Sequence, residues 1–210
     1  MSAPFSRPAR MVAGMIAILA AATFALQVSI NDGSPFTAFV MLFRFFTIWS
    51  NFAAGAIMAW VATGRGIDRR VLLALATALS VVALVYHALL AADHHPVGLD
   101  WWTNLSFHTL IPASVIGWWM AVTRKDGFQP QRVPFVMIAP VLYTVFALGY
   151  GELSGFYAYF FIDKSVLGWP QLVANIVGLA AFFMAMGVLL MGLRSLIWRR
   201  RDGAAPSAAA

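Results

Sequence analysis

The sequence contains no cysteine and few charged residues. The absence of cysteine excludes disulfide bonds, thiolate metal sites and a cysteine nucleophile. Only 10% of the 210 residues are charged, whereas soluble domains typically have about 25%. The sequence also lacks the alternating apolar and polar segments, each of about ten residues, that are typical of membrane β-barrels. With 61% of its residues hydrophobic, the chain is too apolar for a soluble domain.

The hydrophobic residues are gathered into six long runs. A hydrocarbon core about 30 Å thick requires about 20 apolar residues in a helix, and helices satisfy their own backbone polar groups in lipid. The sequence therefore predicts an all-α integral membrane protein, with one six-helix transmembrane domain over 1–202 and a disordered Ala/Pro/Ser tail over 203–210. The predicted helices are 11–29, 37–62, 71–92, 101–123, 133–151 and 170–197.

The charges fall on alternate sides of these runs. If six helices alternate, one side carries twelve basic residues: Arg7, Arg10, Arg65, Arg69, Arg70, Arg124, Lys125, Arg132, Arg194, Arg199, Arg200 and Arg201. The other side carries a single lysine together with five carboxylates: Lys164, Asp32, Asp93, Asp100, Glu152 and Asp163. Basic loops stay in the cytoplasm, so we expect an inner-membrane protein with both termini cytoplasmic. The net charge of +6 then reflects topology and contact with anionic lipids, and we expect no binding of nucleic acid.

Polar residues at membrane depth are the candidate functional residues, because burying them in lipid is costly. In the second run, Arg44, Thr47 and Asn51 have the i, i+3, i+7 spacing of one helix face. Each has an ordinary alternative. A membrane threonine often bonds to the carbonyl four residues earlier, here Phe43. An asparagine often joins two helices, and an arginine often snorkels to the headgroups.

The fourth run has a second polar face and a helix breaker. Asn104 and His108 are spaced i, i+4, and Pro112 has no N–H to donate to the His108 carbonyl. We therefore expect the helix to kink or open at His108. The third run adds Tyr86 and His87 at a similar depth, so these groups can form one site. The ordinary alternative for His108 is a neutral histidine packed against a neighbouring helix.

A hydroxyl beside an imidazole in a water-restricted pocket suggests acyl chemistry. Threonine is a poor nucleophile until a base removes its proton, and neutral imidazole is a suitable base. Spacing alone does not identify such a pair across two helices.

Three short segments, occurring in order, resemble a known family. They are Phe46-Thr47-Ile48-Trp49-Ser50-Asn51, Asn104 to Pro112, and Gly155 to Asp163 followed by Gly168-Trp169-Pro170. They are similar to the bacterial branch of the androgen-induced membrane protein family, which includes the androgen-dependent regulator of tissue factor pathway inhibitor. The resemblance implies an intramembrane threonine hydrolase that cleaves fatty acid esters of hydroxy fatty acids, with Thr47 as nucleophile and His108 as base.

The remaining polar residues are then expected to support this pair. Asn51 or Asn104 would donate to the oxyanion, Asp163 would orient His108, and Arg44 would bind a lipid carboxylate, with His87 in the same cluster. We expect lipids as substrate and surroundings, and no metal or cofactor. The sequence does not specify an oligomeric state.

Two other functions use the same residues. A haem-binding electron carrier would take His87 and His108 as axial ligands. A transporter, channel or lipid-binding protein would use the polar cavity without covalent chemistry, although only Pro112 and Pro140 interrupt helices in the way that transporters often show.

Overall fold

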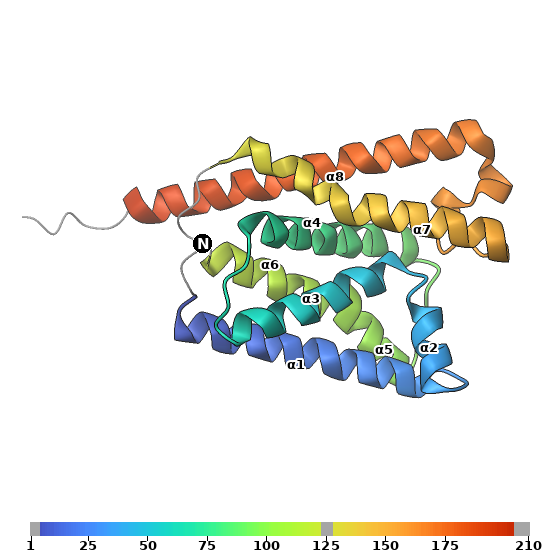
Figure 1. The fold of residues 1–210 in the computed structure, drawn as a ribbon, viewed down its shortest axis with the longest axis horizontal. Helices are drawn as coiled ribbons and strands as arrows, with labels where there is room; N and C mark the ends of the chain where they lie inside the picture. The colour runs from blue at the N-terminus through green and yellow to red at the C-terminus, as the bar shows by residue number, and fades with distance from the viewer. Residues whose placement is uncertain (1–4, 123–127, 204–210) are drawn as a thin grey trace, which may run out of the picture.

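The computed structural model describes residues 5–122 and 128–203, and every regular element within these ranges is a helix. The elements form an elongated bundle whose helices run roughly along its length (Figure 1). Five helical stretches are long and apolar enough to cross a membrane, and a sixth span results if a bent helix pair counts as one. The chain therefore fits a multi-pass membrane protein. The predicted tail is 203–210. Its first residue, Gly203, is the last residue of the final helix, and positions 204–210 lie outside the described residues.

Three of the expected spans appear as helical stretches, and two of them contain a π-helical turn. The first run forms α1 (Arg7–Ile30). The third forms α4 (Arg69–Val85) and continues as the π-helix η1 (Tyr86–Leu90). The fourth forms α5 (Leu99–Leu105), the π-helix η2 (Ser106–Leu110) and α6 (Ile111–Val122).

The last two runs are longer than the sequence predicts. A 3₁₀ segment, η3 (Pro130–Met137), leads into α7 (Ile138–Ser154), and a short 3₁₀ turn, η4 (Phe160–Ile162), precedes α8 (Lys164–Gly203). Within α8 the backbone leaves the helical region at Gly168, which has φ 70°. Pro170 follows at once, where the first turn of a helix tolerates a missing N–H.

The prediction of one helix over 37–62 is wrong. The run is divided into α2 (Pro35–Leu42) and α3 (Phe46–Ala62), which meet at an angle of 107°. Phe45 has an extended backbone (φ −104°, ψ 135°). The carbonyls released at the break find side-chain donors, because the Trp49 indole N–H bonds to the Phe43 carbonyl (2.7 Å) and the Tyr143 hydroxyl bonds to the Arg44 carbonyl (2.7 Å). These two bonds satisfy backbone groups that lipid cannot.

Helix α4 occupies the centre of the bundle, where it contacts α3, α6, α7, α8 and η3 (Figure 1). Its Leu72, Ala76 and Leu79 are almost completely buried. Helices α1 and α3 approach closely at Gly55. A Cβ atom placed on Gly55 would lie 3.1 Å from the Cβ atom of Ala20. Small residues commonly permit such close contact between membrane helices.

The fold separates basic from acidic residues along the bundle. The start of α1, the α3–α4 connection and the end of α8 lie at one end, and the α1–α2, α4–α5 and α7–α8 connections lie at the other (Figure 1). Apart from Arg44 and Lys164, the described basic residues are therefore at the first end, together with Asp68 and Asp202, and the five acidic residues named above are at the second. Arg124 and Lys125 lie outside the described residues.

Candidate catalytic site

The candidate nucleophile and base lie next to each other. Thr47 is the second residue of α3, and its Oγ1 atom is 3.4 Å from Nε2 of His108 in η2. This distance is at the long end of hydrogen bonding, as is common for catalytic pairs without substrate. The alternative in which Thr47 bonds to the Phe43 carbonyl is wrong, because α3 begins after Phe43 and that carbonyl accepts from Trp49.

The main-chain contact of His108 determines which ring nitrogen carries the proton. Nδ1 lies 3.0 Å from the backbone carbonyl of Asn104, and a carbonyl can only accept. Nδ1 is therefore the protonated nitrogen, and Nε2, which faces Thr47, has a free lone pair. The expected opening of the helix is confirmed as the π-helix η2, which ends just before Pro112. The ring thus has the tautomer and direction that a general base for Thr47 requires.

Tyr86 covers one face of the His108 ring. The two rings are stacked, with centroids 3.7 Å apart and planes inclined by 13°. The Tyr86 hydroxyl accepts a hydrogen bond from the Asn104 side-chain amide (2.6 Å) and lies 3.3 Å from Nδ1 of His94. The histidine is therefore held from its edge by a carbonyl and from its face by an aromatic ring.

The start of α3 has backbone N–H groups that the N-cap residue does not cap. Phe45 makes no side-chain hydrogen bond to the first turn of the helix, so these N–H groups need another acceptor. The Tyr159 hydroxyl lies beside the Thr47 hydroxyl and faces the backbone N–H groups of Phe46 and Thr47. Burial raises the pKa of the Tyr159 phenol, so the hydroxyl stays protonated at neutral pH and can donate. An oxygen atom thus already occupies a position in front of two N–H groups and next to the nucleophile.

A mainly apolar cavity of about 250 Å³ opens at Thr47. Its polar lining consists of Thr47, Tyr86, Tyr143, Thr144 and Tyr159. Valine, leucine, isoleucine and phenylalanine side chains from α4, α7, η4 and α8 form most of the remaining wall. A ligand pocket is typically apolar with a few placed polar groups, and this wall suits an acyl chain.

Arg44 does not share a helix face with Thr47 and Asn51. It lies in the break between α2 and α3, so the expected i, i+3, i+7 face is wrong. Its guanidinium stands over the rings of Phe156 (4.9 Å) and Tyr150 (5.5 Å), and its buried Nε atom has no hydrogen-bond partner. The side chain is only partly exposed and points at one aromatic residue of α7 and one of the α7–α8 connection.

Asn51 joins two helices, which is the structural role that the sequence offered as the alternative to a role in catalysis. It is fully buried, and its side-chain N–H₂ group donates to the carbonyls of Thr47 (2.8 Å) and Phe107 (3.0 Å). Both hydrogens of the amide are used in these bonds, so this arrangement does not favour Asn51 as the oxyanion donor. The Asn104 side-chain amide donates to the Tyr86 hydroxyl, so this arrangement does not favour Asn104 as an oxyanion donor either.

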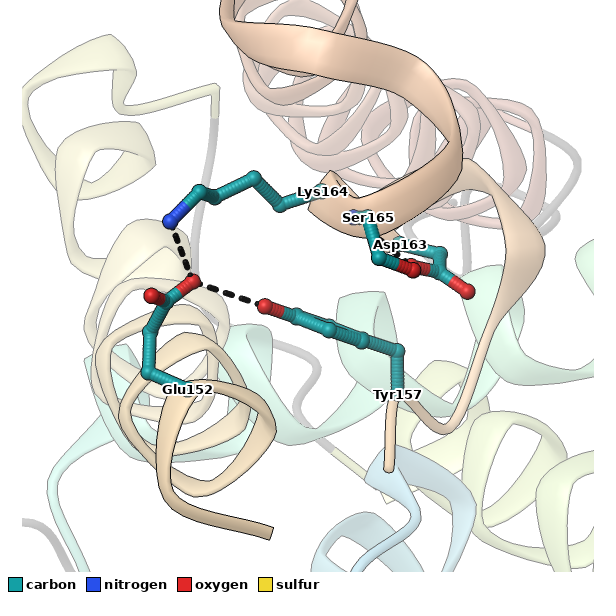
Figure 2. A network of polar contacts seen from close by, with 5 residues as sticks. All are labelled: Glu152, Tyr157, Asp163, Lys164 and Ser165. Atoms are coloured by element: carbon teal, nitrogen blue, oxygen red, sulfur yellow. Dashed lines mark hydrogen bonds and ion pairs between the residues drawn. The ribbon is translucent and has the colours of Figure 1, made fainter. Parts of the chain in front are cut away.

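Asp163 is not the residue that orients His108. Its carboxylate accepts from the backbone N–H (3.0 Å) and hydroxyl (2.5 Å) of Ser165 at the start of α8. Figure 2 shows this contact together with the neighbouring cluster, in which Lys164 (2.6 Å) and the Tyr157 hydroxyl (2.8 Å) both bond to Glu152. The Asn104 carbonyl takes the orienting position that we expected for Asp163. The Glu152 cluster instead fixes the loop that carries Tyr159.

His87 is exposed and contacts Thr109, the residue that follows His108, instead of contacting Thr47 or His108 through a hydrogen bond. Its Nε2 atom is 3.0 Å from the Thr109 hydroxyl, next to His108 in sequence. The reacting nitrogens of His87 and His108 therefore face different hydroxyl groups. This arrangement does not favour two axial ligands to one haem iron.

Residue-by-residue reading of the sequence did not identify Tyr143 and Tyr159 as members of the site. Tyr159 is in the third segment that carries the family resemblance, so a signal for it was present. Tyr143 lies in an apolar run with no distinguishing pattern. Comparison of the chain with protein families, curated proteins and solved structures found no match.

Proposed function

We propose that this protein is an intramembrane lipid-ester hydrolase with Thr47 as nucleophile and His108 as general base. The observation that carries the proposal is the 3.4 Å contact between Thr47 Oγ1, in the wall of an apolar cavity, and the lone-pair nitrogen of His108. The family resemblance of the three segments points to the same chemistry. It also gives the proposed substrate class, fatty acid esters of hydroxy fatty acids.

In the first step, Thr47 Oγ attacks the ester carbonyl carbon while His108 Nε2 accepts the hydroxyl proton. The tetrahedral intermediate collapses, the alkoxide leaves with the proton from His108, and the acyl group stays on Thr47. Water then attacks this acyl-enzyme and gives a proton to His108. The bond between Thr47 Oγ and the acyl carbon breaks, His108 returns the proton to Thr47 Oγ, and the fatty acid is released. The Asn104 carbonyl keeps Nδ1 protonated throughout and stabilises the imidazolium that forms.

The oxyanion is stabilised at the beginning of α3. The backbone N–H groups of Phe46 and Thr47 face the position of the Tyr159 hydroxyl oxygen, which marks where the carbonyl oxygen of an ester fits. As the ester binds, the phenol turns to donate its own hydrogen to the carbonyl oxygen. A single donor of this kind contributes about 3 kcal/mol of transition-state stabilisation in other enzymes. The break between α2 and α3 thus supplies both the nucleophile and its donors.

The remaining features determine which lipid binds. The acyl chain occupies the cavity lined by α4, α7 and α8. Arg44, whose guanidinium lies over the rings of Tyr150 and Phe156, binds the acidic group of the lipid. With the basic end of the bundle in the cytoplasm of an inner-membrane protein, this site lies in the outer half of the bilayer.

The test uses purified protein and a p-nitrophenyl ester of a fatty acid in detergent micelles. Wild type should release nitrophenol, and Thr47→Ala and His108→Ala should each lose most of this activity. A positioned general base contributes about 100-fold or more. Phe36→Leu, on an exposed residue of α2, is the matched control. Unchanged turnover in either site variant would end the proposal.

One observation favours a second candidate, a transporter or non-catalytic lipid-binding protein. Discontinuous helices at membrane depth are typical of transporter binding sites, and α2 and α3 form such a broken helix. Lipid flux in proteoliposomes that persists in Thr47→Ala, together with no ester turnover by wild type, would favour this candidate over the hydrolase.

A further inference from the structure

Two π-helices face each other at His108. η1 carries Tyr86 and His87, and η2 carries His108 and Thr109. The segments are joined twice, by the Tyr86–His108 stack at 3.7 Å and by the contact between His87 Nε2 and Thr109 Oγ1 at 3.0 Å. π-Helices are rare, and they occur frequently at functional sites.

The two π-helices do not have the same local cause. Pro112 follows η2 and cannot bond to the His108 carbonyl, which accounts for its altered hydrogen bonding. η1 has the sequence Tyr-His-Ala-Leu-Leu, which contains no residue that breaks an α-helix. Its geometry therefore depends on tertiary contacts, and the contacts of Tyr86 and His87 with η2 are the ones it makes at this site.

Asn104 completes a closed set of contacts around the imidazole. Its backbone carbonyl accepts from His108 Nδ1 (3.0 Å), and its side-chain amide donates to the Tyr86 hydroxyl (2.6 Å). The Tyr86 ring in turn covers the face of His108, and Tyr86 is itself buried. Rotation of the imidazole away from Thr47 would break the carbonyl contact and collide with the Tyr86 ring.

We propose that Tyr86 is a positioning residue, which holds the His108 ring in the plane that directs Nε2 at Thr47. The proposal rests on the hydrolase function above and extends it. An aromatic face attracts a cation, so the stack also favours the imidazolium that forms in the transition state over the neutral ring before it. The ring face performs this role, and the Tyr86 hydroxyl only anchors it through Asn104.

Kinetics of three variants separate the ring face from the hydroxyl. Tyr86→Leu removes the face, and kcat for the p-nitrophenyl ester should fall about 30-fold or more while KM stays within about twofold, because misplacing a catalytic group affects mainly the chemical step. Tyr86→Phe keeps the face and should recover most of this loss. His94→Gln removes the other contact of the hydroxyl and should behave like wild type.

Nuclear magnetic resonance of ¹⁵N-labelled histidine in the full-length protein gives a readout that needs no activity. The chain has four histidines, and His108→Gln identifies the signals of His108. Wild type and Tyr86→Phe should show one tautomer, protonated at Nδ1, whereas Tyr86→Leu should show averaged tautomers. If wild type fails to turn over, the hydrolase function fails, and the spectra still test the positioning. Unchanged spectra in Tyr86→Leu, or changed spectra with unchanged kcat, would overturn the proposal for Tyr86.

Discussion

At the scale of single residues, the proposed site combines one nucleophile, one base and hydrogen-bond donors that belong mainly to the backbone. His108 depends on the Asn104 carbonyl for its tautomer, and the proposed oxyanion position depends on the N–H groups of Phe46 and Thr47. The identity of a residue does not show whether its backbone N–H or carbonyl takes part in a site. The sequence therefore points to the side chains of Asn51 and Asp163 for these roles, whereas in the structure Asn51 bonds to two carbonyls and Asp163 to Ser165.

Tyr159 provides the sharpest test of the oxyanion position. Tyr159→Phe removes one hydroxyl and keeps the ring that stacks on Phe161 (5.1 Å). We expect kcat for the p-nitrophenyl ester to fall about 100-fold, the usual effect of losing one oxyanion donor. Tyr150→Phe is a matched control, because its hydroxyl makes no described hydrogen bond. Equal kcat in wild type and Tyr159→Phe would remove this residue from the mechanism.

At the scale of elements, two irregular segments create the site. The break between α2 and α3 places Thr47 in the first turn of a helix, and the loop between α7 and α8 brings Tyr159 to it. The loop is fixed to α7 by the Glu152 cluster of Figure 2 and by Tyr157, whose ring lies directly over Gly151. A Cβ atom on Gly151 would collide with the Tyr157 ring, so a larger residue at this position requires the ring to move.

Gly151→Ala should displace Tyr157 and, with it, the loop that carries Tyr159. We expect a lower thermal midpoint and a lower kcat than in wild type. The control Gly149→Ala lies in the same helix with open space at its Cβ position and should be neutral or slightly stabilising. Adding Gly151→Ala to Tyr157→Ala should cost almost nothing further, because the clash is then gone. Additive losses in the double variant would refute the contact as the cause.

The elements were predictable to different degrees for physical reasons. Long apolar runs specify spans by length alone, and five of the six expected spans are present as single helical stretches. Pro112 predicts the opening at His108, because a missing N–H changes the hydrogen bonding of the helix locally. No residue in the sequence predicts the break at Arg44. No proline or glycine lies there, and its released carbonyls are satisfied by Trp49 and by the distant Tyr143.

At the scale of the whole molecule, the uneven distribution of basic residues predicts an orientation in the membrane, with the basic end in the cytoplasm. A chain without cysteine allows a direct test with single introduced cysteines. In intact cells, Asp93→Cys and Val166→Cys should react with a membrane-impermeant maleimide, whereas Thr63→Cys should react only after lysis. The opposite pattern would invert the orientation and move the site to the cytoplasmic half of the bilayer. All three positions are exposed.

The central claim is that His108 activates Thr47 for attack on an acyl group. The most direct measurement is peptide mass spectrometry of the purified protein after reaction with a fluorophosphonate, which forms a stable adduct with an activated hydroxyl. We predict an adduct on Thr47 in wild type, an adduct on the same position in Thr47→Ser, and none in His108→Gln. A wild-type protein left unmodified at Thr47, or equal modification in His108→Gln, would contradict the account.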